Sequence, residues 1–229
     1  MNLLVLEGSS QNISISIVCN NKVVADYNRR MKSKAAYFVP YIDKYLKINS
    51  LSLKNFDAFV VGRGPGSFTG LRIAFSVAKA FSIALKKPLI SIGSFFSMAY
   101  PFREKKNMIA VIGDARRGLI YAALFSSKNN SLILRKKEKL ANLSEFVKDH
   151  RDCYFVTYDN QLLSQAASEF PGLEFSKRCV YPRAKYLVPF AMDCYNKQEF
   201  TPVDKLEPLY LHSKTCQIRK SNIKNQKSK

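Results

Sequence analysis

Few side chains in this chain have the types and spacing that chemistry requires, and two of them are carboxylates next to turns. Glu7 ends a short apolar run and precedes a Gly-Ser pair, a place from which a carboxylate can orient a hydrated magnesium ion. The alternative role for Glu7 is a hydrogen-bonding group at a strand end. Asp114 is the other candidate, and its alternative role is a turn aspartate paired with one of the two arginines that follow closely.

The two histidines argue against a metal centre. Histidine ligands of a metal on a helix come in pairs with a fixed spacing, but His150 and His212 lie far apart and the chain has no H-x-x-x-H motif. Both are expected at the surface. We therefore expect no metal site and no catalytic residue in this chain.

The most specific stretch, residues 60–73, places glycines and a proline between an apolar strand and an apolar helix. Backbone N–H groups at such a helix N-terminus can bind a phosphate. However, the spacing of Gly64, Gly66 and Gly70 misses the dinucleotide fingerprint, and no Lys-Ser or Lys-Thr pair follows. The other interpretation, which the spacing favours, is a tight strand-to-helix turn in which glycines let the backbone run close to a neighbour.

Hydrophobic patterns predict three antiparallel strands followed by alternating helices and strands. In the first half we expect strands at residues 3–6, 13–17, 22–27, 57–61 and 88–92, and helices at 33–48 and 68–86. In the second half we expect strands at 109–112, 119–125, 131–134 and 153–157, and helices at 143–150 and 185–195. This order indicates an α/β fold with mixed sheets.

The chain is expected to form two lobes and a tail. A proline and a charged run within residues 100–107 mark the joint, which assigns residues 1–104 to an N-terminal lobe and 105–214 to a smaller C-terminal lobe. Residues 215–229 are basic, poor in apolar side chains and without periodicity, a composition typical of a disordered tail.

Composition favours a reducing compartment. The 229 residues are 47% apolar, enough for a core, and the five cysteines are scattered without a C-x-x-C pair. We recognise no leader and no run approaching the length of a membrane span, so we expect a cytoplasmic protein without membrane contact. The formal net charge of +20 favours polyanions such as RNA or acidic partners, although a generally basic proteome produces the same excess.

Two predicted helices carry much apolar surface. The helix at residues 33–48 has a tyrosine stripe beside an aliphatic one, and the helix at 68–86 is apolar nearly all round. The second is either a core helix under the second lobe or, with the first, a docking surface, for which tyrosines are well suited. The candidate partner-binding residues are Tyr37, Phe38, Tyr41, Ile42, Tyr45, Phe68, Leu71, Arg72, Phe75, Ser76 and Lys79.

Four strings in this order, LLVLEGSS, GRGPGSFTGLRIA, GDARRGLIYAALF and PLYLHS, resemble the TsaB (YeaZ-like) family. The resemblance implies the duplicated ribonuclease-H-like fold of the actin and sugar-kinase superfamily (ASKHA). It also implies assembly with the paralogue TsaD and the ATPase TsaE, which together place threonylcarbamoyl on the adenosine beside the tRNA anticodon (t6A formation). Because TsaD carries the transfer chemistry in that family, this chain is expected to be a non-catalytic scaffold or activator.

The resemblance also bears on ligands. The family usually has Asp where Glu7 stands, and the His-Ser pair that often starts the first helix is replaced by Met31-Lys-Ser-Lys34. A vestigial nucleotide site is then expected at Glu7, Gly8, Ser9, Gly64, Gly66, Ser67 and Asp114, with ATP and metal on the partner subunits. Contact with tRNA is expected to be indirect or through the basic surface.

Three alternatives stay open. In the first, the chain is an independent ATPase or phosphotransferase of the actin-like superfamily, using Glu7 and the glycine-rich loop. Or it is a stand-alone RNA-binding module driven by charge, which would bind with a strong salt dependence. An uncovered apolar helix face also allows a homodimer when the partner is absent.

Overall fold

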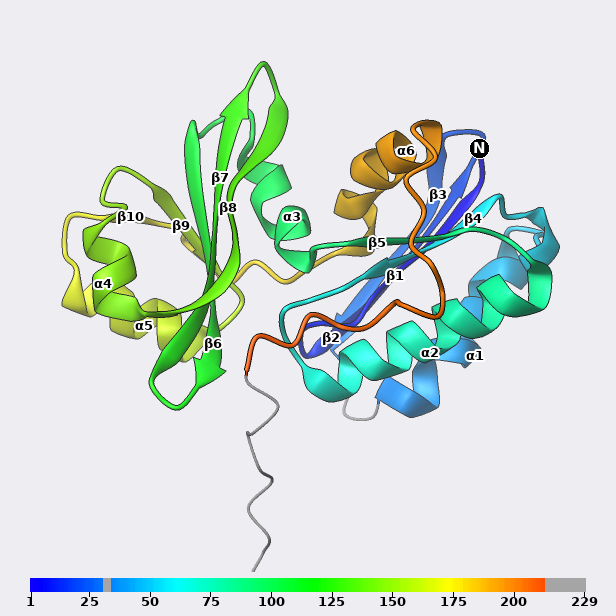
Figure 1. The fold of residues 1–229 in the computed structure, drawn as a ribbon, viewed down its shortest axis with the longest axis horizontal. Helices are drawn as coiled ribbons and strands as arrows, with labels where there is room; N and C mark the ends of the chain where they lie inside the picture. Colours follow the sequence, from blue (N-terminus) through cyan, green and yellow to red (C-terminus); the bar gives the residue numbers. More distant parts are fainter. Residues whose placement is uncertain (31–33, 213–229) are drawn as a thin grey trace, which may run out of the picture.

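The computed structural model describes residues 1–30 and 34–212, and it has two lobes, each built on a five-stranded sheet (Figure 1). The helix start expected at Ser33, the tail at residues 215–229 and Cys216 lie outside the described residues. The first sheet has the strand order β3-β2-β1-β4-β5, and the second has the order β10-β9-β6-β7-β8.

The first sheet and its helices follow the predicted order closely. The elements are β1 (Leu3–Glu7), β2 (Asn12–Cys19), β3 (Lys22–Arg30), α1 (Lys34–Ile48), β4 (Ala58–Gly62), α2 (Phe68–Leu85) and β5 (Leu89–Ile92). A short helix that the sequence did not predict, α3 (Ser94–Ala99), then leads toward the second lobe. In Figure 1, α1 and α2 cover one face of this sheet and α6 covers the other.

The second sheet repeats the first. Its elements are β6 (Met108–Arg116), β7 (Leu119–Lys128), β8 (Ser131–Asn142), α4 (Leu143–Lys148), β9 (Tyr154–Thr157), α5 (Asn160–Glu169) and β10 (Glu174–Phe175), followed by α6 (Val188–Asn196). In each sheet the first strand is antiparallel to the second and parallel to the fourth. The repeated topology confirms the expected duplicated ribonuclease-H-like α/β fold.

The central strand β1 is buried on both faces, which explains its unbroken apolar sequence. Leu4 and Leu6 belong to the core that includes Phe38 of α1 and Phe75 of α2. Leu3 and Val5 belong to a second core that includes residues of α6. The helices on both faces therefore hold the carboxyl end of β1 and the turn that follows it in a fixed place.

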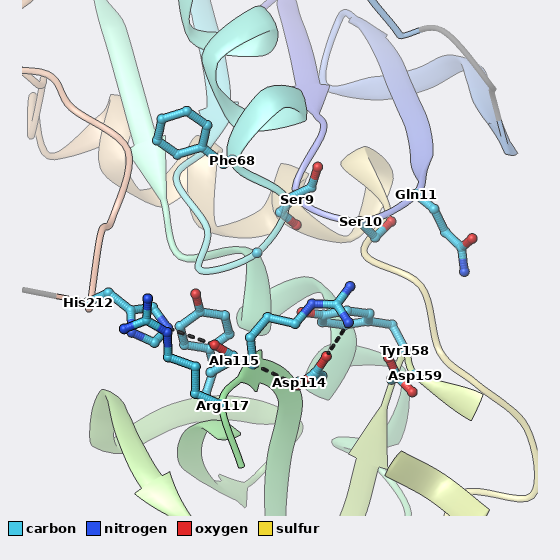
Figure 2. Close-up of a pocket in the computed structure, with 14 residues that line it drawn as sticks. Ser9, Ser10, Gln11, Phe68, Asp114, Ala115, Arg117, Tyr158, Asp159 and His212 are labelled. Carbon is cyan, nitrogen blue, oxygen red and sulfur yellow. Dashed lines mark hydrogen bonds and ion pairs between the residues drawn. The ribbon is translucent and has the colours of Figure 1, made fainter. Parts of the chain in front are cut away.

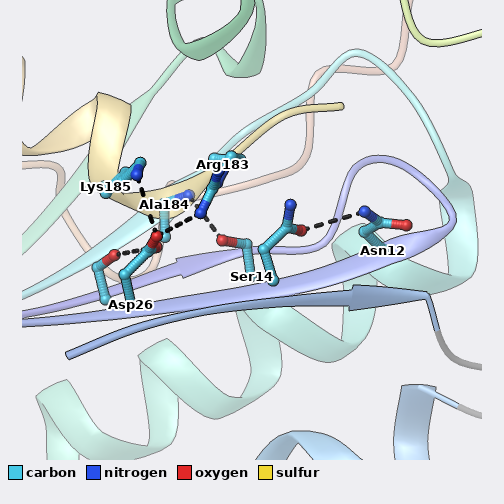
Figure 3. Close-up of polar contacts among 8 residues, drawn as sticks. Asn12, Ser14, Asp26, Arg183, Ala184 and Lys185 are labelled. Carbon is cyan, nitrogen blue, oxygen red and sulfur yellow. Dashed lines mark hydrogen bonds and ion pairs between the residues drawn. The ribbon is translucent and has the colours of Figure 1, made fainter. Parts of the chain in front are cut away.

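The chain returns to the first lobe earlier than expected. Ala184 begins a short 3-10 helix, and its N–H group donates to Ser14 Oγ of β2 at 2.9 Å. Asp26 of β3 forms ion pairs with Arg183 and Lys185 (Figure 3). The lobe expected at residues 105–214 therefore ends before residue 183, because α6 packs on the first sheet and the N–H group of Thr201 after it donates to the Leu89 carbonyl of β5.

Helix α2 is long and apolar enough, by length and composition alone, to cross a membrane. The expectation that no segment approaches a membrane span was therefore wrong. Six residues of α2, among them Leu71, Ala74 and Phe75, are buried within the protein, and the helix packs on β4 and α1. This is the environment of a core helix in a folded lobe.

The described cysteines are Cys19, Cys153, Cys179 and Cys194, and all four are free thiols. Cys153 lies in the hydrophobic core of the second lobe, with Phe146 and Phe155, and 2% of its surface is exposed. Burial, followed by the neighbouring Asp152 carboxylate, raises the pKa of the Cys153 thiol to about 12. The thiol is therefore protonated, and hence a poor nucleophile, at neutral pH.

Stability is expected to fall as the pH rises from 9 toward about 12, in part through Cys153. Above the ordinary thiol pKa of 9.0 the unfolded chain loses this proton while the folded chain keeps it, so unfolding is favoured. One such thiol contributes at most about 1.4 kcal/mol per pH unit. Urea unfolding across this range should show a flatter pH dependence for Cys153→Ala than for the wild type, and parallel curves would contradict the prediction.

Candidate functional site

A cleft of about 700 Å³ lies between the two lobes (Figure 2). One wall is the β1–β2 turn with the loop before α2, and the other is the β6–β7 turn with the residues that follow β9. Of the seven residues predicted as a vestigial nucleotide site, four line this cleft, namely Ser9, Gly66, Ser67 and Asp114. Glu7, Gly8 and Gly64 do not line it.

The glycine-rich loop packs against the β1–β2 turn. The N–H group of Ser67 donates to the Ser9 carbonyl at 2.5 Å, and the Ser67 hydroxyl caps α2 by accepting from the N–H group of Gly70. Gly66 has a φ of 153°, and a Cβ atom there would collide with the Ser9 carbonyl. The N–H groups of Ser67 and Gly70 therefore have protein acceptors, as in the tight-turn interpretation of this loop.

Glu7 points away from the cleft. It is 1% exposed, and its Oε1 atom accepts a hydrogen bond from the N–H group of Ser9 at 2.6 Å. The other carboxylate oxygen lies against Gly62, where a Cβ atom would not fit. Glu7 therefore has the strand-end role that was left open, and it cannot orient a metal ion in the cleft from this position.

Asp114 is occupied by its own turn. Its Oδ1 atom accepts from the N–H group of Arg116 at 2.7 Å, and its Oδ2 atom lies 3.2 Å from Arg116 Nη1 (Figure 2). Arg116 and Arg117 both adopt positive φ values, which a tight two-stranded turn requires. The structure therefore shows the turn aspartate paired with an arginine that the sequence offered as the alternative.

The cleft brings together only part of the predicted nucleotide site, because Glu7, Gly8 and Gly64 are not among the residues that line it. The N–H groups of Ser67 and Gly70 donate within the protein, and Asp114 is bonded to its own turn. Burial, with a smaller effect of Tyr121, raises the pKa of Tyr158. Among residues 1–30 and 34–212, no three His, Cys, Asp or Glu side chains are arranged to hold a metal ion.

The two histidines lie apart, and one differs from expectation. His150, expected at the surface, is 6% exposed, and its Nδ1 atom lies 2.7 Å from the Phe146 carbonyl. His212 is half-buried at the edge of the cleft, with Nε2 2.7 Å from the Ala115 carbonyl. Both rings are anchored to main-chain oxygens, which suits a structural role.

Helix α1 divides its two stripes unequally between core and surface. Phe38 and Ile42 are at most 1% exposed and face the sheet, so they cannot contact a partner, contrary to the prediction. Tyr41 stacks on Tyr27 of β3 with ring centres 4.4 Å apart, and Tyr45 lies 5.4 Å from the same ring. The predicted tyrosine ladder is therefore half-buried, and Tyr37, 43% exposed, is its one open member.

Helix α2 also separates into a buried and an open face. Leu71 and Phe75 are 1% and 3% exposed, so these two predicted partner contacts belong to the core instead. The small residues Gly70, Ala74 and Ala78 face inward as well, and Gly70 lies so close to Gly8 that a Cβ atom on Gly8 would come within 2.6 Å of its carbonyl.

The open face of α2 is what we call the α2 stripe. Its exposed residues recur at helical spacing along the whole helix, and they are Phe68, Thr69, Arg72, Ser76, Ala80, Ile83 and Ala84. Lys79 is half-buried beside them. In Figure 1 the second lobe does not cover α1 or α2, so the interpretation of α2 as a helix beneath that lobe is wrong.

Comparison with known proteins identifies the family. The chain is 28% identical to the tRNA threonylcarbamoyladenosine biosynthesis protein TsaB of Bacillus subtilis over 75% of this chain and 77% of that protein. It is 22% identical to TsaB of Escherichia coli over 93% and 95% of the two chains. The fold of YeaZ from Pseudomonas aeruginosa matches 92% of this chain and 99% of that one, with a TM-score of 0.80 and 21% identity.

A family model completes the comparison. The model described as TsaD, tRNA N6-adenosine threonylcarbamoyltransferase, matches residues 31–187. The chain belongs to the TsaD family, among its TsaB (YeaZ-like) members. The two lobes of this TsaB-family chain therefore share their fold with the solved YeaZ structure.

Sequence reasoning missed one part of the surface of this TsaB-family chain, the C-terminal strap at residues 201–212. Its Leu206 is buried, and the N–H group of Leu209 donates to the Arg63 carbonyl at 2.8 Å. Tyr210 accepts a hydrogen bond from Arg72 Nε at 3.1 Å, and its ring lies tilted against that of Phe68 with centres 5.3 Å apart. The string PLYLHS marked the family, but it has no periodicity from which this path along α2 could be predicted.

Proposed function

We propose that this chain is a non-catalytic subunit that binds TsaD and supports, with TsaE, the transfer of threonylcarbamoyl to the adenosine beside the tRNA anticodon. Membership among the TsaB proteins supports a part in the biosynthesis of this modified nucleoside. The α2 stripe is the observation that supports the docking role, because its seven residues are exposed on one face of the helix. The strap at residues 201–212 borders this face and contacts it at Phe68 and Arg72 through Tyr210.

The α2 stripe has the shape that a second helix requires. Ser76, Ala80 and Ala84 follow one another at four-residue steps and are exposed, so a helix of TsaD can approach the backbone closely there. Tyr37 of α1 and Phe68 supply larger apolar contacts at the sides. Aromatic residues such as these two are enriched at protein interfaces.

The proposal also assigns the cofactors to the partner subunits. We propose that ATP and metal are held by the partner subunits in the cytoplasm. The internal bonds of Ser67, Gly70 and Asp114 in the cleft of this chain support this division. An independent ATPase or phosphotransferase is the second candidate, but no contact in the cleft favours it. Purified chain mixed with ATP and magnesium should therefore show no turnover above a protein-free control, and turnover would contradict the non-catalytic role.

Replacing Ser76 by Arg is expected to weaken binding to TsaD at least about 100-fold. The new side chain fills the closest point of helix approach and places a charge where a dry contact is proposed, which costs about 3 kcal/mol. Ser76 is exposed, so the fold should be retained. Calorimetric titration with purified TsaD measures the affinity, and circular dichroism measures whether the fold is retained.

The matched control is Ser164→Arg on α5 of the second lobe, which is also exposed on a helix. It should bind TsaD as the wild type does. Equal binding by all three proteins would remove the α2 stripe from the interface, and an absence of binding by the wild type would reject the proposed function itself.

A further inference from the structure

The edge strand β8 concentrates positive charge. Arg135, Lys136, Lys137 and Lys139 are all exposed, and we call these four residues the β8 basic strip. β8 is the outermost strand of the second sheet, so the strip lies along an open edge. The strip is not among the residues that line the cleft, and it is in the opposite lobe from the α2 stripe.

The single carboxylate within the strip faces the other way. Glu138 is 7% exposed, and its Oε2 atom lies 3.8 Å from Arg63 Nη2 of the first lobe. Its other oxygen reaches Gly93, where a Cβ atom would displace it. The charge of Glu138 is therefore directed to the joint between the lobes, and it does not neutralise the neighbouring lysines.

Two irregularities in the β7–β8 pairing allow this separation. Between the pairs Ala122–Lys139 and Leu124–Lys136, β8 has one more residue than β7. Between Leu124–Lys136 and Phe125–Leu134 it has one more again. Bulges redirect side chains. Here they let Glu138 turn inward while its basic neighbours on both sides stay exposed.

The fold positions two of the cations without neutralising them. Arg135 Nε donates to Ser126 Oγ at 2.6 Å. Lys136 Nζ lies 3.0 Å from His150 Nε2, and because His150 Nδ1 must donate to the Phe146 carbonyl, Nε2 is the atom that accepts. Among the described residues, no carboxylate forms an ion pair with any member of the strip, whereas Asp26 serves both Arg183 and Lys185 elsewhere.

We propose that the β8 basic strip binds the phosphodiester backbone of RNA. Unpaired Lys and Arg side chains along an exposed edge bind phosphates and release counterions. The whole of β8 contains no aromatic side chain, the residue type that protein interfaces favour, so its chemistry suits a charged backbone better than a protein surface. The inference rests on the proposed function, in which tRNA is the substrate of the assembly.

Edge lysines also protect sheets from unwanted pairing, and the test separates the two roles. The variant is Lys136→Gln/Lys137→Gln/Lys139→Gln. The control is Lys22→Gln/Arg29→Gln/Arg30→Gln, which removes the same charge from exposed positions of β3, the edge strand of the first sheet. Both are made in the full chain, because residues 213–229 are basic in sequence and contribute equally to every protein compared.

Binding of a tRNA transcript is measured by fluorescence anisotropy between 50 and 200 mM KCl. The β8 variant should bind about 10-fold more weakly at low salt, and its plot of log affinity against log salt should be shallower by about 2 to 3. The β3 control should stay within about twofold of the wild type. The inference is overturned if the wild type binds no tRNA, if the β8 variant matches it, or if the control loses as much affinity.

Binding to TsaD is measured on the same proteins. The β8 variant should bind TsaD as tightly as the wild type, because the strip and the α2 stripe lie on different lobes. If the β8 variant binds tRNA as tightly as the wild type while the wild type binds TsaD, this inference alone is rejected. A wild type that fails to bind TsaD would reject the proposed function while leaving the tRNA comparison as a separate result.

Discussion

Replacing Phe75 by Asp is expected to destabilise the first lobe strongly, and not merely to release a partner. Phe75 is 3% exposed in the core that joins β1, β4, α1 and α2. Truncating a buried Phe costs about 3–5 kcal/mol, and leaving a carboxylate in its place adds the cost of an unpaired buried charge. The melting temperature should fall by roughly 10–20 °C.

The matched control is Phe68→Asp on the same helix. Phe68 is 52% exposed, and its contacts are the Arg72 guanidinium 3.9 Å above its ring and Tyr210 of the strap. Its replacement should cost about 1 kcal/mol or less. Thermal unfolding followed by circular dichroism measures both variants. A Phe75→Asp protein as stable as the Phe68→Asp protein would show that α2 is not packed as described here.

The sequence predicted the first lobe well because its patterns are local. The alternation of apolar and polar residues in β2 and the continuous apolar run of β1 indicate which faces of these strands are buried. The apolar run that follows the glycine-rich stretch likewise indicates where α2 begins. These features need no knowledge of distant residues.

The second lobe was less predictable, for reasons that differ between its elements. β8 was expected to end at residue 134, because its basic run and bulges break the alternation that marks a strand. Helix α5 was missed although Asp159 caps it by accepting from the N–H group of Leu162, a signal that a search for caps would find. Helix α3 is mostly buried between the lobes, so it shows no amphipathic period.

The sequence indicated which segments meet at the candidate site, but not in which direction their side chains point. Ser9, Gly66, Ser67 and Asp114 do meet across one cleft. That Glu7 turns inward depends on the space left by Gly62 on the neighbouring strand, which no local pattern reveals. Helix α2 has two rows of small residues at four-residue steps, and the sequence does not say which row faces the sheet. In the structure the row that begins at Gly70 faces inward, where Gly70 lies close to Gly8.

Replacing Gly66 by Ala is expected to have the second large effect, because Gly66 is the closest approach between the loop and the β1–β2 turn. An added Cβ atom would overlap the Ser9 carbonyl, a main-chain group that cannot rotate away. The φ of 153° is also costly for a residue with a side chain. Strain and overlap together should lower stability by about 3–5 kcal/mol.

Gly118→Ala in the β6–β7 turn isolates the contribution of overlap. Gly118 also has a positive φ, of 75°, but an added Cβ atom would meet nothing within 4 Å. It should therefore cost only about 1–2 kcal/mol, the conformational penalty alone. Urea unfolding of the two variants gives the difference directly. Equal losses would mean that the loop can move away from Ser9, and the loop would then be open enough to reconsider as a phosphate site.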